Sequence, residues 1–384
     1  MTSGMFAFSA EQDELRATVR RFLAERSPES EVRRLMETEQ GYDPGVWSLM
    51  AGQLGLQGLA LPEKVGGSGF SFVDLQIVLE EMGRALLCAP FLSSVVLGAQ
   101  ALLTSGDDSA VARWLPGIAD GSTVATLAVT EASGSWDAGD VATQAAPAGD
   151  GYALTGEKLF VLDGHVADLL LVMALAPEGA SLFAVEATGA TGLTREKMPT
   201  LDATRTQARV RFEATPAVLV GDAGGAAGPL ERTLDLAAAA LAAEQAGGAR
   251  RVLETAVEYA KVREQFGRPI GSFQAIKHKA ADMLLAVESA TSAAYAAGWA
   301  VDAASADPAD EGAAAEVGVL ASLAKAYCSE AYYQCAAENI QIHGGIGFTW
   351  EHPAHLYYKR AKSSEIMFGT PRHHRARLAD RLGF

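Results

Sequence analysis

The sequence predicts a mostly α-helical protein with a central β domain. Hydrophobic residues recur at helical spacing as far as about Gly117, short runs of partly alternating character follow Gly121, and helical spacing returns at Leu230. We therefore divide the 384 residues into an N-terminal helical domain (1–120), a central β domain (121–228) and a C-terminal helical bundle (229–384).

The first domain begins with a helix start signal. Ser9, with Gln12 three residues later, resembles a capping box. Four apolar residues then follow at helical spacing: Leu15, Val19, Phe22 and Leu23. Further helices are expected near Trp47–Leu54, Val78–Leu87 and Ala110–Leu115, with a Pro/Gly loop over Leu61–Gly69.

The second domain consists of short segments bounded by Gly, Pro or Asp. We expect strands over Val124–Val129, Tyr152–Leu154, Leu159–Leu162, Leu169–Val172, Leu182–Val185 and Ala208–Phe212. Arg209 and Arg211 alternate with Val210 and Phe212, which is typical of a strand with one buried face. Many short strands predict a sandwich or a barrel.

The third domain follows a glycine-rich linker, Gly221–Gly228. Its helical pattern runs to the C-terminus, and Asp307–Gly312 looks like a turn between two long helices. We expect a four-helix bundle of long helices.

Composition narrows the class of protein. A net charge of −16 argues against a nucleic-acid binder, which needs a basic surface. The three cysteines form no CxxC pair and cannot close a disulfide framework, and we predict no metal site. Neither a signal peptide nor an apolar run of about 20 residues is present, so we expect a cytoplasmic protein without membrane insertion.

Two stretches carry candidate chemistry. In Tyr259–Met283, a helix runs into an Arg-Glu-Gln-Phe-Gly-Arg-Pro loop, where Arg263 and Arg268 suit phosphates and Phe266 offers an apolar face. In Gln341–Glu351, three glycines expose amides that can hold an anion. Taken singly, these stretches are better explained as solvated arginines in a helix–turn–helix and as a glycine-rich helix end.

Together the two stretches resemble the signatures of the flavin-dependent acyl-CoA dehydrogenase family. The matching segments are Gln265-Phe-Gly-Arg-Pro-Ile-Gly271, Gln341-Ile-His-Gly-Gly-Ile-Gly-Phe348, Pro62–Gly69 and Ala128–Glu131. The resemblance covers nearly the whole chain and implies an acyl-CoA dehydrogenase-like fold. It also implies FAD as cofactor and α,β-dehydrogenation of an acyl-CoA thioester, in which a glutamate takes the α-proton and the flavin takes the β-hydride.

The resemblance implies site residues for the flavin. Arg263, Gln265 and Phe266, with Gln341, Gly344 and Gly345, would hold the adenine and pyrophosphate end of a flavin in a neighbouring subunit. Val129 and Thr130 match the segment that binds the flavin ring.

The ring half departs from the family pattern. Ala132-Ser-Gly-Ser-Trp136 replaces the usual Pro-Gly-Ala-Gly-Ser, and Phe160-Val161-Leu162 replaces a Trp-Ile-Thr that packs on the ring and bonds N5. The family's catalytic glutamate aligns with Phe368, before Gly369-Thr370, and its alternative position on the first bundle helix aligns near Ala237.

Other bases are weak candidates. Glu244 lies seven residues beyond Ala237, so its backbone is displaced by roughly 10 Å. Glu365 and His343 carry less weight, and a structural role is the alternative for all three. The basic cluster Arg372–Arg377 suits CoA or flavin phosphates, or is simply a solvated tail.

Three hypotheses remain at this point. The chain is an acyl-CoA dehydrogenase with an unrecognised base, a non-catalytic FAD-binding subunit of a heterotetramer of the steroid side-chain type, or a flavin monooxygenase on the same fold. The first implies a homotetramer and the second a second dehydrogenase subunit. An electron-transfer flavoprotein is one candidate electron acceptor.

Overall fold

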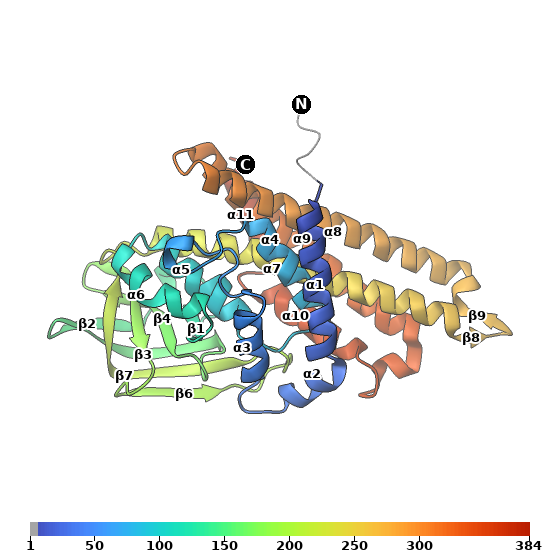
Figure 1. Ribbon diagram of the computed structural model, residues 1–384, viewed down its shortest axis with the longest axis horizontal. Helices are drawn as coiled ribbons and strands as arrows, with labels where there is room; N and C mark the ends of the chain where they lie inside the picture. Colours follow the sequence, from blue (N-terminus) through green and yellow to red (C-terminus); the bar gives the residue numbers. More distant parts are fainter. Residues whose placement is uncertain (1–6) are drawn as a thin grey trace.

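The computed structural model describes residues 7–384 and shows three parts in the expected order (Figure 1). The first part is helical, with α1 (Ala10–Arg26), α2 (Glu29–Met36), α3 (Pro44–Gly52), α4 (Phe72–Ala85), α5 (Ala99–Thr104) and α6 (Asp108–Ala119). The capping box of α1 is confirmed: Ser9 N donates to Gln12 Oε1 at 3.0 Å, and Gln12 N donates to Ser9 Oγ at 3.2 Å.

The central domain is a closed barrel that contains two long strands, of 12 and 14 residues, among shorter ones. Its seven-stranded sheet contains β1 (Ala125–Ala128), β2 (Gln144–Ala148), β3 (Gly151–Leu162), β4 (Leu169–Ala176), β5 (Gly179–Glu186), β6 (Leu193–Lys197) and β7 (Gln207–Val220). Strands β4, β2, β3, β7 and β5 follow one another, and pairing of β5 with β4 closes the ring. Val210 and Phe212 of β7 are buried, while Arg209 and Arg211 are partly or fully exposed, as the alternation predicts.

Two predicted strands are one. Tyr152–Leu154 and Leu159–Leu162 both lie in β3, whose pairing with β7 is irregular between Leu154 and Gly156 and between Lys158 and Val161. Such bulges let a single strand change the direction of its side chains.

The C-terminal domain differs from the expected four long helices. It has three long helices, α7 (Ala227–Val262), α8 (Gln274–Ala306) and α9 (Glu311–His343), and two shorter ones, α10 (Ala354–Ile366) and α11 (Pro371–Arg381). Gly344 has φ 63° and ψ −137°, which ends α9, and the turn at Phe368 and Gly369 separates α10 from α11. The turn predicted over Asp307–Gly312 does join α8 to α9.

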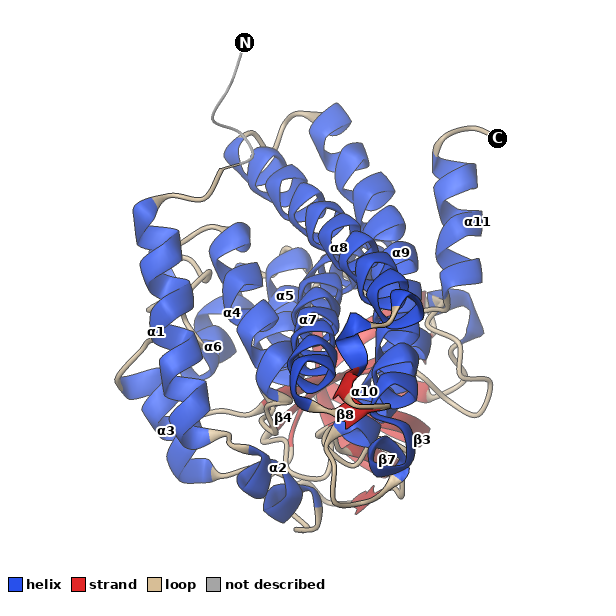
Figure 2. Ribbon diagram, turned by 90° about the vertical axis from the view of Figure 1, so that its right-hand side faces the viewer, coloured by secondary structure: helices blue, strands red, loops and turns tan. Residues whose placement is uncertain are grey.

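Helices α4 and α7 approach closely enough to exclude side chains at their crossing (Figure 2). A Cβ at Gly83 would lie 2.0 Å from Glu244 O, and a Cβ at Gly247 would lie 1.9 Å from Glu80 O. The absence of a side chain at Gly83 and Gly247 therefore lets the N-terminal domain pack directly against the bundle. Within residues 7–384, no helix is both long and apolar enough to span a bilayer.

Candidate functional site

The first candidate segment forms a hairpin at the end of α7. Strands β8 (Glu264–Gln265) and β9 (Arg268–Pro269) are joined by Phe266 and Gly267, whose φ angles are 54° and 75°. Two consecutive left-handed residues favour a tight two-residue hairpin turn. The Phe266 ring is 91% exposed at the tip of the hairpin.

The side chains of this hairpin differ in how far they are engaged. Arg263 is exposed, and its guanidinium forms no ion pair or hydrogen bond with any described residue. Gln265 Nε2 donates to Glu264 O at 2.7 Å, and the Arg268 guanidinium lies 4.1 Å from the centre of the Phe273 ring. Of the two arginines expected to bind phosphates, Arg263 is therefore the one without a hydrogen bond, ion pair or ring contact to a described side chain.

The second candidate segment lies beside the first. Gln341, Gly344 and Gly345 are exposed at the end of α9, and a Cβ at either glycine would meet nothing within 4 Å. Tyr259 of α7 stacks on His343 of α9, with ring centroids 4.2 Å apart. This contact brings together the two segments expected at the adenine end of the flavin.

His343 itself has a structural place. Its ring is buried, and its Nδ1 lies 2.8 Å from Asn339 O. Burial lowers the pKa of His343 despite this hydrogen bond. The ring stack and the hydrogen bond within α9 favour the structural role for this residue.

The segment expected to hold the flavin ring is buried and internally bonded. Thr130 Oγ1 donates to Leu159 O, and Leu159 N donates to Thr130 O at 2.9 Å. Val129 O accepts from Lys158 Nζ at 3.0 Å, and Lys158 also pairs with Glu131 at 2.6 Å. Burial lowers the pKa of Lys158 to about 8 against the pull of Glu131.

The neighbouring residues of β3 offer little polar chemistry. Leu162 and Val161 are buried, and Leu162 O accepts from Thr126 Oγ1 at 2.6 Å. Phe160 is 40% exposed with φ 59°, so its ring lies at the edge of the domain. No side chain of Phe160-Val161-Leu162 can donate a hydrogen bond to a flavin.

Phe368 is a buried ring in a strained turn. Its φ is 59°, a region that residues with a Cβ rarely adopt, and it is 2% exposed. The ring meets Trp136 edge to face, with centroids 5.0 Å apart. In the sequence, Trp136 is only a departure from the family pattern. Its contact with Phe368 could not be predicted, because the two residues are far apart along the chain.

Two buried basic side chains hold the Phe368 turn. His374 Nε2 donates to Phe368 O at 3.1 Å, and Lys325 Nζ donates to Gly369 O at 3.1 Å and to Glu365 O at 3.2 Å. Burial lowers the pKa of His374 to about 3 and that of Lys325 to about 7. No sequence signal identified either residue.

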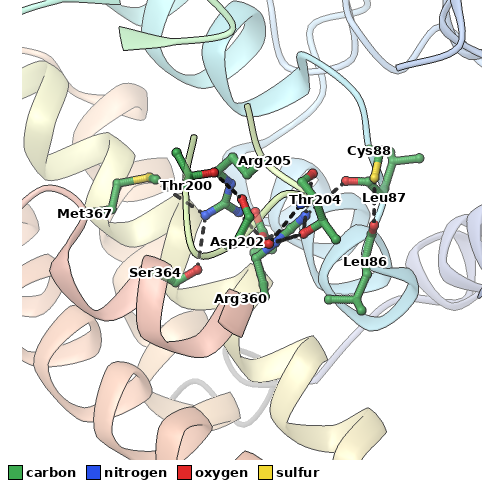
Figure 3. A network of polar contacts seen from close by, with 11 residues as sticks. Leu86, Leu87, Cys88, Thr200, Asp202, Thr204, Arg205, Arg360, Ser364 and Met367 are labelled. Carbon is green, nitrogen blue, oxygen red and sulfur yellow. Dashed lines mark hydrogen bonds and ion pairs between the residues drawn. The ribbon is translucent and has the colours of Figure 1, made fainter. Parts of the chain in front are cut away.

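Glu244 lies in a buried ion network that joins the three domains. Figure 3 shows Arg205, Arg360 and Asp202 of this network. Its carboxylate accepts from Arg205 and, at 2.8 Å, from Arg360. Arg360 also pairs with Asp202 at 3.0 Å and donates to Leu87 O of the N-terminal domain at 3.4 Å.

The network argues against Glu244 as a base. Burial raises the pKa of Glu244, but the charges of Arg205 and Arg360 outweigh it and the pKa is lowered. A carboxylate shared by two guanidinium groups has little tendency to take a proton. Ala237, at the family's alternative position for the base, is a fully buried residue of α7 and has no group that could take a proton.

The remaining candidates are also paired. Glu365 Oε2 accepts from Lys362 Nζ at 3.0 Å. In the basic cluster, Arg375 pairs with Glu330, and Arg377 pairs with Glu231 at 2.9 Å. These carboxylates neutralise two of the arginines that suited phosphates.

The two expected halves of a flavin site lie far apart within one chain. The hairpin lies at one end of α7, and the β domain lies at the other (Figure 1). Since α7 has 36 residues, it spans roughly 54 Å. Among residues 7–384, no cluster of three or more His, Cys, Asp or Glu side chains could hold a metal ion.

Comparison with known proteins covers all three domains. The models of the acyl-CoA dehydrogenase N-terminal, middle and C-terminal domains match residues 9–122, 126–215 and 227–383. The chain is 36% identical to acyl-CoA dehydrogenase IpdE2 of Mycolicibacterium smegmatis over 370 residues, which covers 96% of this chain and 98% of the relative.

Two solved structures have the same fold. A variant of the Tcur3481–Tcur3483 steroid ACAD is 33% identical, with a TM-score of 0.83 and coverage of 97% of both chains. The ChsE4–ChsE5 complex from Mycobacterium tuberculosis contains a chain that is 29% identical, with a TM-score of 0.86 and coverage of 98% of both chains. The chain therefore belongs to the acyl-CoA dehydrogenase family, whose members are flavoprotein oxidoreductases that act on the CH–CH bond of acyl-CoA thioesters.

Proposed function

We propose that this chain is the non-catalytic subunit of a heteromeric acyl-CoA dehydrogenase and completes the flavin site of a partner subunit. In the assembled enzyme, bound FAD would supply hydride acceptance from the β-carbon, and a glutamate of the partner would take the α-proton, which together convert the acyl-CoA to an enoyl-CoA. This chain contributes binding groups and no base.

One observation carries the proposal: the adenine-end residues are exposed, and the ring-end residues are buried. Arg263 and Gly345 are exposed and have no described side-chain partner that would compete with a ligand. Phe266 is 91% exposed, and its ring contacts that of Phe273 only edge to face, with centroids 6.1 Å apart. Thr130 and Leu162 are buried, and the hydroxyl of Thr130 is already donated to Leu159 O. A half-site is useful only if another chain supplies the other half.

The free residues fit the phosphate and adenine part of FAD. The Arg263 guanidinium suits the pyrophosphate, because its planar fork matches phosphate oxygens. Phe266 presents a flat apolar face to the adenine, and the amides of Gly344 and Gly345, with the Gln341 side chain, suit a phosphate or ribose. Open space beside both glycines leaves room for such a ligand.

Relatives support the heteromer and a substrate class. Two of the similar structures are described as pairs of proteins, Tcur3481–Tcur3483 and ChsE4–ChsE5. The first is described as a steroid ACAD, so we propose a steroid-derived acyl-CoA as substrate. We expect a heterotetramer reoxidised by an electron-transfer flavoprotein. We place it in the cytoplasm, since all three cysteines are free thiols.

The test is the FAD content of the assembled enzyme. The chain is co-expressed with a second family member that keeps the glutamate, and FAD is counted per chain. We expect about one FAD for each pair of chains, and acyl-CoA oxidation only in the presence of the partner. Robust oxidation by the chain alone, with one FAD per chain, would defeat the proposal.

A variant tests the assigned half-site. Arg263→Ala removes a charge-assisted hydrogen bond worth about 1.5–3 kcal/mol, so FAD should bind roughly ten- to a hundredfold more weakly. Arg250→Ala is the matched control, because Arg250 lies on α7, which ends directly before Arg263, and it pairs with Glu288 at 2.8 Å. FAD retention is measured by gel filtration on dilution. Equal retention in the two variants would refute the role of Arg263.

A further inference from the structure

Two residues that depart from the family pattern contact each other. Trp136 occupies the position where the family has the serine of Pro-Gly-Ala-Gly-Ser, and Phe368 occupies that of the glutamate. Their rings meet edge to face at 5.0 Å, with an interplanar angle of 73°. This geometry is favourable for two aromatic rings. Two separate departures therefore form one structural unit.

The Phe368 ring has little freedom to move out of the way. Two hydrogen bonds hold the backbone of this turn: His374 donates to Phe368 O, and Lys325 donates to Gly369 O. The left-handed φ of Phe368 costs free energy, so the surrounding contacts must maintain it. The ring is nearly inaccessible, whereas Trp136 lies on a partly exposed loop of the β domain.

The space behind the turn is also filled. Arg205 Nη1 donates to Ser364 Oγ at 3.1 Å and lies 3.8 Å from Met367 Sδ, next to Phe368 (Figure 3).

Dehydrogenation needs open space in front of the side chain at position 368. A base must come within hydrogen-bond reach of the proton it removes, so a productive acyl thioester must bring its α-carbon up to the side chain at position 368. In this chain, the Trp136 ring covers that side chain. Restoring an acid at position 368 would leave the approach blocked.

We propose that Trp136 and Phe368 together close the acyl-binding space of this chain, so that Trp136 excludes acyl-CoA independently of the missing glutamate. The inference rests on the proposed function, since it concerns the half-site that does not catalyse. Trp136 is thus a specificity-determining residue. Its ring excludes substrate from this subunit, which also lacks the glutamate that would act as base.

The test compares three variants of the full chain in complex with its partner: Phe368→Glu, Trp136→Ser and the double variant. Isothermal titration with butyryl-CoA gives the number of binding sites per pair of chains. We expect one site in the wild type and in Phe368→Glu, and two in the double variant. In the double variant, butyryl-CoA should fill a second site that the titration of Phe368→Glu does not show, because the overpacking by Trp136 is relieved.

Controls separate the outcomes. Phe384→Ser removes an aromatic ring that is 93% exposed and lies outside both half-sites, and it should leave one site. Since Trp136 lies on a surface loop, Trp136→Ser should fold, and by itself it should add weak butyryl-CoA binding at a second site that the wild type lacks. Two sites in Phe368→Glu, or no added site in the double variant, overturns the proposal. FAD counted per chain tests the proposed function separately, because neither ring holds the adenine half-site.

Discussion

Replacing Glu244 with glutamine separates the two roles considered for this residue. Glu244→Gln keeps the size of the side chain and removes the negative charge between Arg205 and Arg360. A catalytic base would lose activity on this change and keep its stability. A member of the buried ion network would lose stability, and we expect this second result.

The magnitude follows from the partners that remain. Arg360 keeps Asp202 at 3.0 Å, but among residues 7–384 Arg205 forms no ion pair other than that with Glu244. Removing one partner of a buried ion pair costs about 3–5 kcal/mol, because the other charge is left uncompensated. We therefore expect the free energy of unfolding to fall by about 3–5 kcal/mol.

The assay is urea unfolding of the purified chain, followed by circular dichroism. Glu254→Gln is the matched control, since Glu254 lies on the same helix and pairs with Arg84, but is 35% exposed. Because the side chains of Arg84 and Glu254 are 18% and 35% exposed, breaking this pair should cost less than breaking the fully buried pair of Glu244. The reasoning fails if Glu244→Gln costs no more than Glu254→Gln, and loss of acyl-CoA oxidation at unchanged stability would restore Glu244 as a base.

Two further predictions concern helix packing and pH. Gly247→Ala should lower the free energy of unfolding by about 1–3 kcal/mol through overpacking against Glu80 O. Gly228→Ala on the same helix, where a Cβ meets only Arg232 Nη1 at 3.7 Å, should not destabilise, and equal losses in urea unfolding would contradict this account. The pKa of Lys325 is about 7 in the folded chain and about 10.4 when unfolded, so between these values the unfolded chain binds more protons and stability rises with pH. Lys325→Met should remove this contribution, so the wild type should gain stability relative to the variant between pH 7 and 9; a constant difference would count against the lowered pKa.

The helices and most strands could be predicted because their signals are local. The Ser9–Gln12 capping box and the alternation in β7 each lie within a few residues. Strands β2 and β6 were not predicted. The first contains Pro147 and several alanines, and the second, Leu193–Lys197, is an edge strand of mainly polar residues that pairs only with β7. Pairing with neighbours, rather than propensity, makes these segments strands.

The site could be predicted only in part, for a similar reason. Arg263 and Gln341 belong to contiguous signatures, so a resemblance identifies them without any knowledge of contacts. The partners of Glu244 come from a loop before β7 and from α10, and no spacing in the sequence links them. Long-range ion pairs and ring contacts therefore decide what Glu244 and Phe368 do.

The hairpin after α7 bears on how chains come together. Association usually loses affinity when a loose segment must be ordered at the interface. Here the turn residues Phe266 and Gly267 already hold the required backbone angles, and Ile270 N donates to Arg263 O at 2.8 Å across the base of the hairpin. Little entropy remains to be lost, so burial of the Phe266 ring would contribute almost fully to binding. In a chain kept apart from its partner, the Phe266 ring stays 91% exposed to solvent.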